Sequence, residues 1–454
     1  MRVAVIGNGI LGTSTALFLK ESCDVVLYGP KKRRGSGTKA AGAMINVFSE
    51  LECGQLENEA LRAKFEMGLH SLMKWPEHLK RIKKDSGKDI LTAQKSCVFK
   101  NKYTTPYELE QFNYLKSQQE TYPNHIQFDR KNPDQIILPT EFSVDSKELL
   151  EALDAILLKS ERVDLVNYDS DYQFHFDPYA TSISISTKDN QETFDAVVIA
   201  AGSFSERIFH SNPAVFEDVQ PLFYGIGNAF NVTLNASTAQ LINLRPGISR
   251  TLNRGGACGF HALPNRGSIY FGATSTVHSQ PEFNPRVQSI NVLSKGLLEQ
   301  FDSHFETGLV ECVVGFRPTT LDSYPLLGKL NDHQIFLATG TKRDGITSSI
   351  AISQYISQAI LNNKYPKALD LFSPQRELIS YFNRELAVEK AAQSMASGRI
   401  MHDSSLRKDW DSVLNESRAY VQNIYSDLLI PKHFGVHPEM LGLFRWHYTP
   451  FGNR

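Results

Sequence analysis

The stretch that decides how this chain is interpreted is residues 315–347, GFRPTTLDSYPLLGKLNDHQIFLATGTKRDGIT. Arg317 is followed directly by a proline, and an apolar strand is predicted over residues 334–339. A second arginine, Arg343, comes just before Gly345, where we expect a helix to begin. The start of a helix presents free N–H groups and the positive end of its dipole. Two guanidinium groups beside a helix start are well suited to grip a carboxylate.

The N-terminus carries a glycine motif of its own, GNGILG at residues 7–12. An apolar run over 2–6 precedes it, helical spacing over 13–21 follows it, and a second strand is predicted over 24–28. In this setting the glycines let the backbone approach a pyrophosphate at the start of the helix. The motif therefore predicts a dinucleotide site with contacts from Gly7, Gly9, Ile10, Leu11 and Gly12.

The end of the second predicted strand departs from the usual dinucleotide site. An acidic residue normally stands there and holds a ribose hydroxyl, but here Gly29 and Pro30 follow the strand. The basic run KKRR at 31–34 comes next and could neutralise a ribose 2′-phosphate, which leaves an NADP-binding reductase as an alternative. A solvated loop is the simpler interpretation, because NADP binding would leave residues 315–347 unexplained.

Together the two ends of the chain resemble the FAD-dependent D-amino acid oxidase (DAO) family, most closely its glycine-oxidase-like branch. The family pattern is G-x-R-P-x-T-x-D-x-x-P-x-x-G, then a strand, then A-x-G-x-x-R-[ND]-G-I. Its fixed positions are all present here, as Gly315, Arg317, Pro318, Thr320, Asp322, Pro325, Gly328, Ala338, Gly340, Arg343, Asp344, Gly345 and Ile346. The resemblance covers roughly residues 1–376, strongly at both ends and weakly in the middle.

The resemblance implies a non-covalently bound FAD with contacts from several further segments. GSGTKAAGAM at 35–44 looks like the family's segment between pyrophosphate and isoalloxazine ring, where small residues let the backbone pass close to a flat ring. The predicted strand at 163–166 looks like the one beside the adenine, and DAVVIAAG at 195–202 ends as a buried parallel strand does beside a nucleotide. Related enzymes of the sarcosine-oxidase type attach the flavin to a cysteine that would align with Gly315, so no covalent link is expected. The further candidate contacts are Lys39, Ala40, Ala41, Gly42, Met44, Val163, Ala201, Gly202, Gly315, Gly340, Asp344, Gly345, Ile346 and Thr347.

The resemblance also implies the chemistry. Arg317 and Arg343 would hold the carboxylate of a small amino acid or N-substituted amino acid, with its Cα–H facing flavin N5. A hydride leaves Cα while the amine forms an imine, with oxygen as the expected acceptor and hydrogen peroxide as product. Thr347 could donate its hydroxyl to the flavin C2 oxygen. His261 stands where the family often has a tyrosine, and it either faces the substrate or is a structural residue of the sheet.

Composition excludes some classes of function. The 454 residues carry a net charge of −1, which argues against a generic nucleic-acid binder. No apolar run is long enough to span a membrane, and strand residues begin at Arg2, which leaves no room for a signal peptide. The five cysteines, including Cys258, are scattered and odd in number, which is typical of reduced thiols. We therefore expect a cytoplasmic protein without a structural metal.

The sequence predicts an α/β fold in which a FAD-binding, Rossmann-like GxGxxG domain is interleaved with an antiparallel-sheet α+β substrate domain. The FAD-binding segments are 1–50, 142–205 and 312–376, and the substrate segments are 51–141 and 206–311. Residues 377–454 remain as a C-terminal helical extension.

The extension has helical spacing over 378–396 and 406–429, and His433 and His437 lie in a stretch that we interpret as a loop rather than a metal site. We interpret the extension as a helical cap on the body or a surface for a homo-oligomer. An active-site lid is one alternative. Another is a docking surface for a partner protein that the flavoprotein modifies or supplies with electrons.

Overall fold

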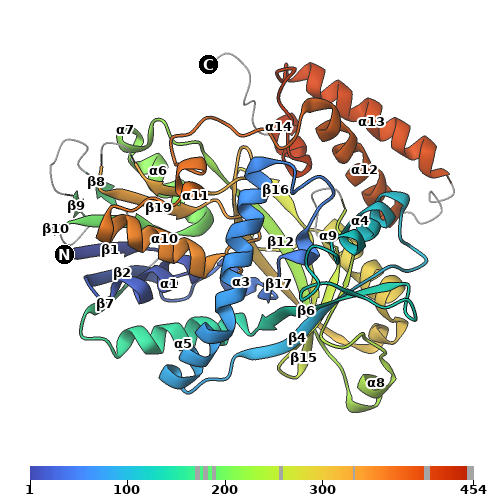
Figure 1. Ribbon diagram of the computed structural model, residues 1–454, viewed down its shortest axis with the longest axis horizontal. Coiled ribbons are helices and arrows are strands. Elements are labelled where there is room, and N and C mark those ends of the chain that lie inside the picture. The colour runs from blue at the N-terminus through green and yellow to red at the C-terminus, as the bar shows by residue number, and fades with distance from the viewer. Residues whose placement is uncertain are drawn as a thin grey trace.

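A computed structural model describes residues 1–168, 174–176, 183–186, 191–254, 259–330, 333–402 and 409–446. Two β-sheets lie side by side with helices around them, and the C-terminal helices stack at one end of the molecule (Figure 1). Cys258 lies outside the described residues, as do 403–408 between the last two long helices. Among the described helices, none combines the length and apolar character needed to cross a membrane.

The six-stranded sheet that carries the N-terminal strand has the order β18-β19-β11-β1-β2-β7. Its strands are β1 (Arg2–Ile6), β2 (Asp24–Pro30), β7 (Val163–Tyr168), β11 (Ala196–Ile199), β18 (Leu326–Lys329) and β19 (Ile335–Thr339). All neighbours are parallel except β18 and β19, which pair antiparallel. This is the arrangement expected from the glycine motif, because that motif joins the first strand to the first helix.

Both faces of this sheet are buried, which explains why its strands are continuous apolar runs. Val3 and Val5 of β1 belong to a core shared with Leu17 of the first helix. The alternate residue Ile6 packs on the opposite face, against a core that includes Phe209. The successive side chains of one strand therefore anchor two separate layers.

The other large sheet has ten strands, and the path through it is β16-β12-β15-β14-β13-β4-β6-β3. β17 pairs with β12 and β5 pairs with β6, both off this path. The strands are β3 (Met44–Ile45), β4 (Leu91–Phe99), β5 (Gln127–Phe128), β6 (Gln135–Val144), β12 (Leu222–Thr233), β13 (Ile248–Thr251), β14 (His261–Asn265), β15 (Ser268–Gly272), β16 (Thr276–His278) and β17 (Leu309–Thr320). A small third sheet contains β8 (His175–Phe176), β9 (Ile183–Ser186) and β10 (Gln191–Phe194).

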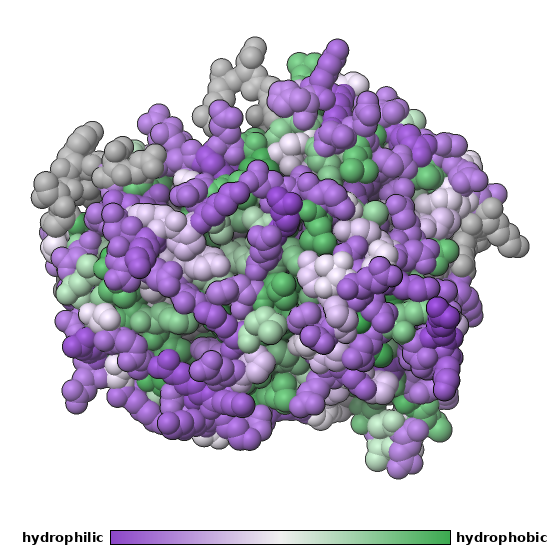
Figure 2. All heavy atoms as spheres, in the orientation of Figure 1, coloured by the Kyte–Doolittle hydropathy of each residue, from purple (hydrophilic) through white to green (hydrophobic). Residues whose placement is uncertain are grey.

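The helices connect and cover these sheets. They are α1 (Ile10–Leu19), α2 (Gly37–Ala40), α3 (Glu59–Ser86), α4 (Pro106–Ser117), α5 (Ser146–Leu158), α6 (Ser205–Ser211), α7 (Pro213–Phe216), α8 (Ala236–Leu241), α9 (Val287–Lys295), α10 (Ser349–Asn362), α11 (Lys367–Leu371), α12 (Arg384–His402), α13 (Trp410–Asp427) and α14 (Leu441–Trp446). Short 3₁₀ turns at η1 (Phe48–Glu50) and η6 (Pro438–Met440) carry residues used below. The face of the molecule in Figure 2 is mainly hydrophilic, with apolar side chains in small groups.

The helix that we expected to begin at Gly345 begins instead at Ser349. Residues 341–348 form consecutive turns first, in which the Asp344 N–H donates to the Thr341 carbonyl and the Ser349 N–H to the Ile346 carbonyl. Gly345 is packed against Thr341, since a Cβ on Gly345 would lie 2.9 Å from the threonine hydroxyl. The prediction was wrong because local spacing cannot distinguish a chain of turns from the first turn of a helix.

The third predicted FAD-binding segment, 312–376, contributes to both sheets. β17 pairs with β12 over its whole length in the larger sheet, whereas β18 and β19 extend the smaller one. The extension starts beyond this segment, and its two long helices, α12 and α13, begin later than the sequence spacing predicted. It packs on the body through a shared apolar core that joins Phe223 and Leu321 to Val421 and Phe444.

The two ends of the family pattern touch where the glycine-rich segment crosses β17. The Phe316 N–H donates to the Gly35 carbonyl at 3.1 Å, and Gly315 lies against Ala40. A Cβ on Gly315 would come within 2.4 Å of the Ala40 Cβ, a distance that real side chains do not reach. Glycine at 315 therefore allows the chain crossing that joins the two halves.

We expect Gly315→Ala to lower the free energy of unfolding by about 1–3 kcal/mol, the usual cost of overpacking. Gly398→Ala is the matched control, because a Cβ there meets nothing within 4 Å and alanine is the better helix former. Urea unfolding followed by circular dichroism measures both. A Gly315→Ala midpoint equal to that of wild type would contradict the argument.

Candidate active site

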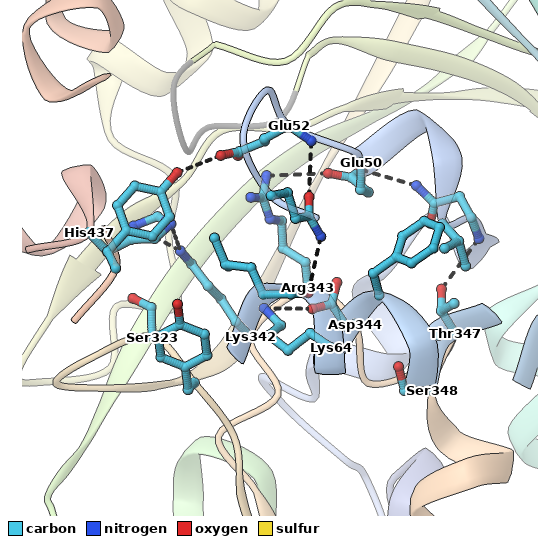
Figure 3. A pocket seen from close by; sticks show the side chains of 18 of the residues that line it. Glu50, Glu52, Lys64, Ser323, Lys342, Arg343, Asp344, Thr347, Ser348 and His437 are labelled. Atoms are coloured by element: carbon cyan, nitrogen blue, oxygen red, sulfur yellow. Dashed lines mark hydrogen bonds and ion pairs between the residues drawn. The ribbon is translucent and has the colours of Figure 1, made fainter. Parts of the chain in front are cut away.

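A cavity of about 80 Å³ lies where α3, the turns at 341–348 and the start of the extension meet (Figure 3). Its walls are unusually rich in ionisable side chains, including Glu50, Glu52, Lys64, Lys342, Arg343, Asp344, Tyr381 and His437. Figure 3 shows Arg343, Lys342 and Lys64 side by side below Glu50 and Glu52. The cavity therefore offers charged groups of both signs to a small polar ligand.

The two predicted arginines sit on neighbouring backbone segments. The Lys342 N–H donates to the Pro318 carbonyl at 2.9 Å, which ties the residue before Arg343 to the residue after Arg317. Arg343 lines the cavity, with Nη1 3.7 Å from a Glu50 carboxylate oxygen. The structure thus brings together two segments that are separated by a turn and two strands.

Arg317 lies on the sheet side of this contact. Its residue in β17 pairs with Gly225 of β12, and its guanidinium lies over Gly227, where a Cβ would come within 2.6 Å. Nη1 donates to the Thr274 carbonyl at 3.1 Å. Arg317 is not among the residues that line the described cavity, so its role toward a ligand stays a prediction.

The ion pair that Arg250 and Glu50 form beside Arg343 was not predicted from the sequence. Arg250 is fully buried in β13 and donates to Glu50 at 3.0 Å, to the Ser49 hydroxyl at 2.8 Å and to the Asn253 side chain at 2.8 Å. Burial opposes ionisation of Glu50, but the charges of Arg250 and Arg343 lower its pKa to about 2. Glu50 is therefore an ionised carboxylate between two guanidinium groups at neutral pH.

His261 is a residue of the sheet interior. It pairs with Arg250 across β13 and β14, and its ring stacks on Tyr270 with centroids 5.9 Å apart. Burial, and then the charge of Arg250, lower the pKa of His261 to about 3, so the imidazole is neutral. His261 does not line the described cavity, and its assignment as a catalytic residue stays a prediction.

Asp322 of the family pattern has a structural role. Its carboxylate forms a two-point ion pair with Arg376 at 2.6 and 3.1 Å, and it also accepts from the Thr320 hydroxyl and the Tyr324 N–H. Such a fork pair is stronger than a single contact. It holds the turn between β17 and β18, and with it the cavity wall that this turn provides.

The N-terminal glycine motif fits a phosphate group. α1 begins at Ile10 with Gly9 as its N-cap, and that glycine offers no side-chain cap to the first N–H groups. A Cβ on Gly12 would lie 1.7 Å from the Gly7 carbonyl oxygen, and Gly7 itself has φ +114°. A Cβ on Gly9 would meet only the Thr38 hydroxyl at 3.5 Å. The Ile10 N–H already donates to the Thr38 hydroxyl at 3.1 Å, but Gly9 adds no side chain over the helix start, so the tightly packed motif still fits a phosphate there.

At the end of β2, the neighbouring polar side chain is the amide of Asn8 rather than a carboxylate. Gly29 carries the Asn8 side chain over it, since a Cβ there would lie 2.0 Å from the amide carbon, and Asn8 Nδ2 donates to the Pro30 carbonyl. In the basic run, Arg33 forms a fork pair with Asp154 at 2.7 and 2.6 Å. Arg34 stacks over the Phe283 ring at 4.3 Å. These contacts weaken the case that the run is a 2′-phosphate site.

The remaining predicted cofactor residues fall into two places. Gly202 has φ +60° and open space above it, and Val163 begins the edge strand of the parallel sheet. On the cavity side, the Thr347 hydroxyl donates to the Met44 carbonyl at 3.2 Å, so it is already engaged within the protein. Of the other members, Ala201 precedes Gly202, and Gly345 and Ile346 lie in the turns before α10. Gly340 has φ +71° and packs against Thr320. Asp344 forms an ion pair with Lys64.

A second and larger hollow, about 550 Å³, adjoins the predicted flavin segment on the sheet side. Its lining includes Lys39, Ala40, Ala41 and Gly42 together with Leu263, Tyr270 and Val313. Tyr270 fixes this segment, because its hydroxyl donates to the Ala40 carbonyl at 3.1 Å and its ring leaves room only for glycine at 42. The predicted segment therefore lines the larger hollow, and the chain reaches the smaller cavity only from Asn46 onward.

Comparison with known proteins gives the family. A family model described as DAO, FAD dependent oxidoreductase, matches residues 2–359. The chain belongs to the DAO family. The predicted resemblance is therefore confirmed, and the family match favours FAD over the NADP alternative. The match ends before the extension begins.

Individual relatives of this DAO-family chain are distant. The bifunctional protein ThiO/ThiG of Synechocystis sp. is 24% identical over 389 residues, covering 83% of this chain and 54% of the relative. The chain thus spans about half the length of that relative. Solved structures of similar fold include glycine oxidase from Geobacillus kaustophilus (TM-score 0.68, 19% identity, 83% of this chain and 100% of that one) and L-proline dehydrogenase from P. horikoshii (0.63, 16%, 83% and 97%). These likenesses confirm the predicted fold class.

We expect Glu50→Gln to destabilise the protein by about 3–5 kcal/mol, because it leaves the buried Arg250 without its anion. The folded-state pKa of Glu50 is lowered, so its contribution is complete above about pH 4.5 and is lost as the pH falls toward 2. The destabilisation should accordingly shrink in acid. Thermal unfolding between pH 3 and 8 measures it.

The control for this measurement is Glu59→Gln, whose carboxylate pairs with the exposed Lys367. That ion pair is screened by solvent, and its loss should change little. Equal effects of the two substitutions would show that the Glu50 pair does not hold the cavity together.

Proposed function

We propose that this protein oxidises the C–N bond of a small amino acid or N-substituted amino acid, giving an imine. FAD would accept the hydride from Cα when bound, and oxygen is the proposed final acceptor, with hydrogen peroxide as product. The observation that carries the proposal is the contact between the two arginine segments, with Arg343 facing a charged cavity in a chain of the DAO family.

The side chains act by binding and orientation. Arg343, with Arg317 from the adjoining strand, would hold the substrate carboxylate and fix the direction of the Cα–H bond, which is the protein's main contribution to rate. Glu50 already neutralises part of the charge of Arg343 and Arg250, so the cationic wall suits one carboxylate rather than a polyanion.

The cofactor is proposed to be non-covalent. A cysteine at 315 has no room, because its Cβ would collide with Ala40, and Cys312 three residues earlier is exposed on β17. Denaturing the purified protein in acid should therefore release all of its yellow chromophore into the supernatant. Chromophore that stays with the precipitated chain would contradict this.

We expect Arg343→Met to raise KM for carboxylate substrates about 10- to 100-fold, the value of a lost charge-assisted hydrogen bond. The KM for uncharged amines should change far less, because they make no such bond. Arg81→Met is the control, since that arginine is half exposed, pairs with Glu21 and lines neither hollow. Equal losses on both classes of substrate would remove Arg343 from the binding site.

A substrate screen tests the proposal itself. Under anaerobic conditions, glycine, sarcosine, D-amino acids or related N-substituted acids should bleach the flavin absorbance, and in air the same compound should yield peroxide. If no member of a broad panel bleaches the flavin, the proposal fails. The alternative would then be a flavoprotein that modifies a partner protein or supplies it with electrons through the C-terminal helices. Self-association through these helices and a cytoplasmic location also stay predictions.

A further inference from the structure

The C-terminal extension reaches into the cavity wall, although the family match ends before it. Tyr381 and His437 both line the cavity, and their rings lie 4.6 Å apart. The two stretches that carry them are joined by hydrogen bonds of the Tyr381 N–H to the Gly435 carbonyl and of the Gly435 N–H to the Ser380 hydroxyl. The Tyr381 hydroxyl donates to Glu52 at 2.5 Å, which fixes one side of this wall.

In the cavity wall, the extension contacts the side chain of Lys342. It is 7% exposed, and its backbone is in the left-handed region with φ +52°. Its ammonium lies 2.5 Å from a Glu439 carboxylate oxygen and 3.1 Å from His437 Nε2, and both partners belong to the extension (Figure 3 shows Lys342 and His437). The body of the protein thus places a buried ammonium whose described side-chain partners come from the extension.

The charge states support an ion pair at neutral pH. Burial lowers the pKa of Lys342 to about 8, and the Glu439 charge opposes the shift. Burial favours protonation of Glu439, but the charges of Lys342, Arg343 and Arg317 outweigh it and lower the pKa of the carboxyl. Burial, and then the Lys342 charge, lower the pKa of His437, so its neutral ring can accept from the ammonium.

This ion pair is not needed to attach the extension to the body. The apolar core shared by Phe223, Leu321, Val421 and Phe444 already buries the underside of the extension. A buried ion pair adds little net stability, but breaking one member leaves an uncompensated charge. The Lys342–Glu439 pair therefore fixes where the Lys342 side chain lies and adds little to the attachment of the extension.

We infer that Glu439 is a positioning residue of the active site: with His437 it clamps Lys342, and through the Lys342–Pro318 contact it holds Arg343 in place for a substrate carboxylate. The extension is then part of the substrate site rather than a cap beside it. This inference rests on the proposed function in assigning Arg343 to the substrate, but the clamp itself does not depend on which amine is oxidised.

The test compares Glu439→Gln with Glu389→Gln in the full-length holoprotein. Glu389 pairs with Arg418 between α12 and α13, so its loss removes a carboxylate from the same extension without touching the cavity. We expect Glu439→Gln to raise KM for the best substrate at least tenfold, with flavin content and kcat changed less than twofold. Hydrogen–deuterium exchange of the amides in 341–348 should accelerate in this variant, and Glu389→Gln should show neither effect.

Two further variants keep the inference falsifiable if Glu439→Gln folds poorly. Glu439→Asp retains the anion and should lose less binding than the amide. Lys342→Met combined with Glu439→Gln removes both charges and should restore flavin content and part of the lost stability. The inference is overturned if Glu439→Gln matches Glu389→Gln in both amide exchange and KM. It is also overturned if the double variant loses more stability than the two single variants together.

The outcomes also separate this inference from the proposed function. Acetate binding, followed by perturbation of the flavin spectrum, reports on the carboxylate site without turnover. If no amine is oxidised by the wild type but Glu439→Gln weakens acetate binding and accelerates exchange in 341–348, the proposed reaction fails and the clamp stands. If amines are oxidised but Glu439→Gln leaves both readouts unchanged, the reaction stands and the clamp fails.

Discussion

One backbone hydrogen bond, from the Lys342 N–H to the Pro318 carbonyl, sets the geometry on which the candidate site depends. It joins Pro318, near the end of β17, to the turns that precede α10, so that Arg317 and Arg343 lie on neighbouring backbone segments. Neither segment could be placed there by local preference alone.

The walls of the site contain several charges that are removed from water and paired within the protein. Glu50 lies between Arg250 and Arg343, Asp344 pairs with Lys64, and Lys342 pairs with Glu439. Burying charges in this way costs desolvation energy that the pairs only partly recover. What such pairs provide is fixed orientation, and an oriented set of charges can stabilise a ligand without reorganising when it binds.

Much of the fold follows from the sequence, because its signals are local. The GxGxxG motif between strand and helix and the buried apolar strands are each contained within some tens of residues, and the structure shows them where they were expected. The Glu50–Arg250 pair could not be predicted, since its members stand 200 residues apart in the chain. The start of α10 was misplaced because glycine and turn residues fit both a helix start and a series of turns. Arg250 is the one charged residue of its short strand, Ile248–Thr251, but the residue that neutralises it is fixed only by the tertiary fold.

The pairing of Lys342 with Glu439 also constrains how this chain can change over evolutionary time. Replacing either residue alone strands a charge in the protein interior, whereas replacing both together does not. The two positions should therefore be inherited as a unit, present together where a homologue keeps the C-terminal helices and absent together where it has lost them.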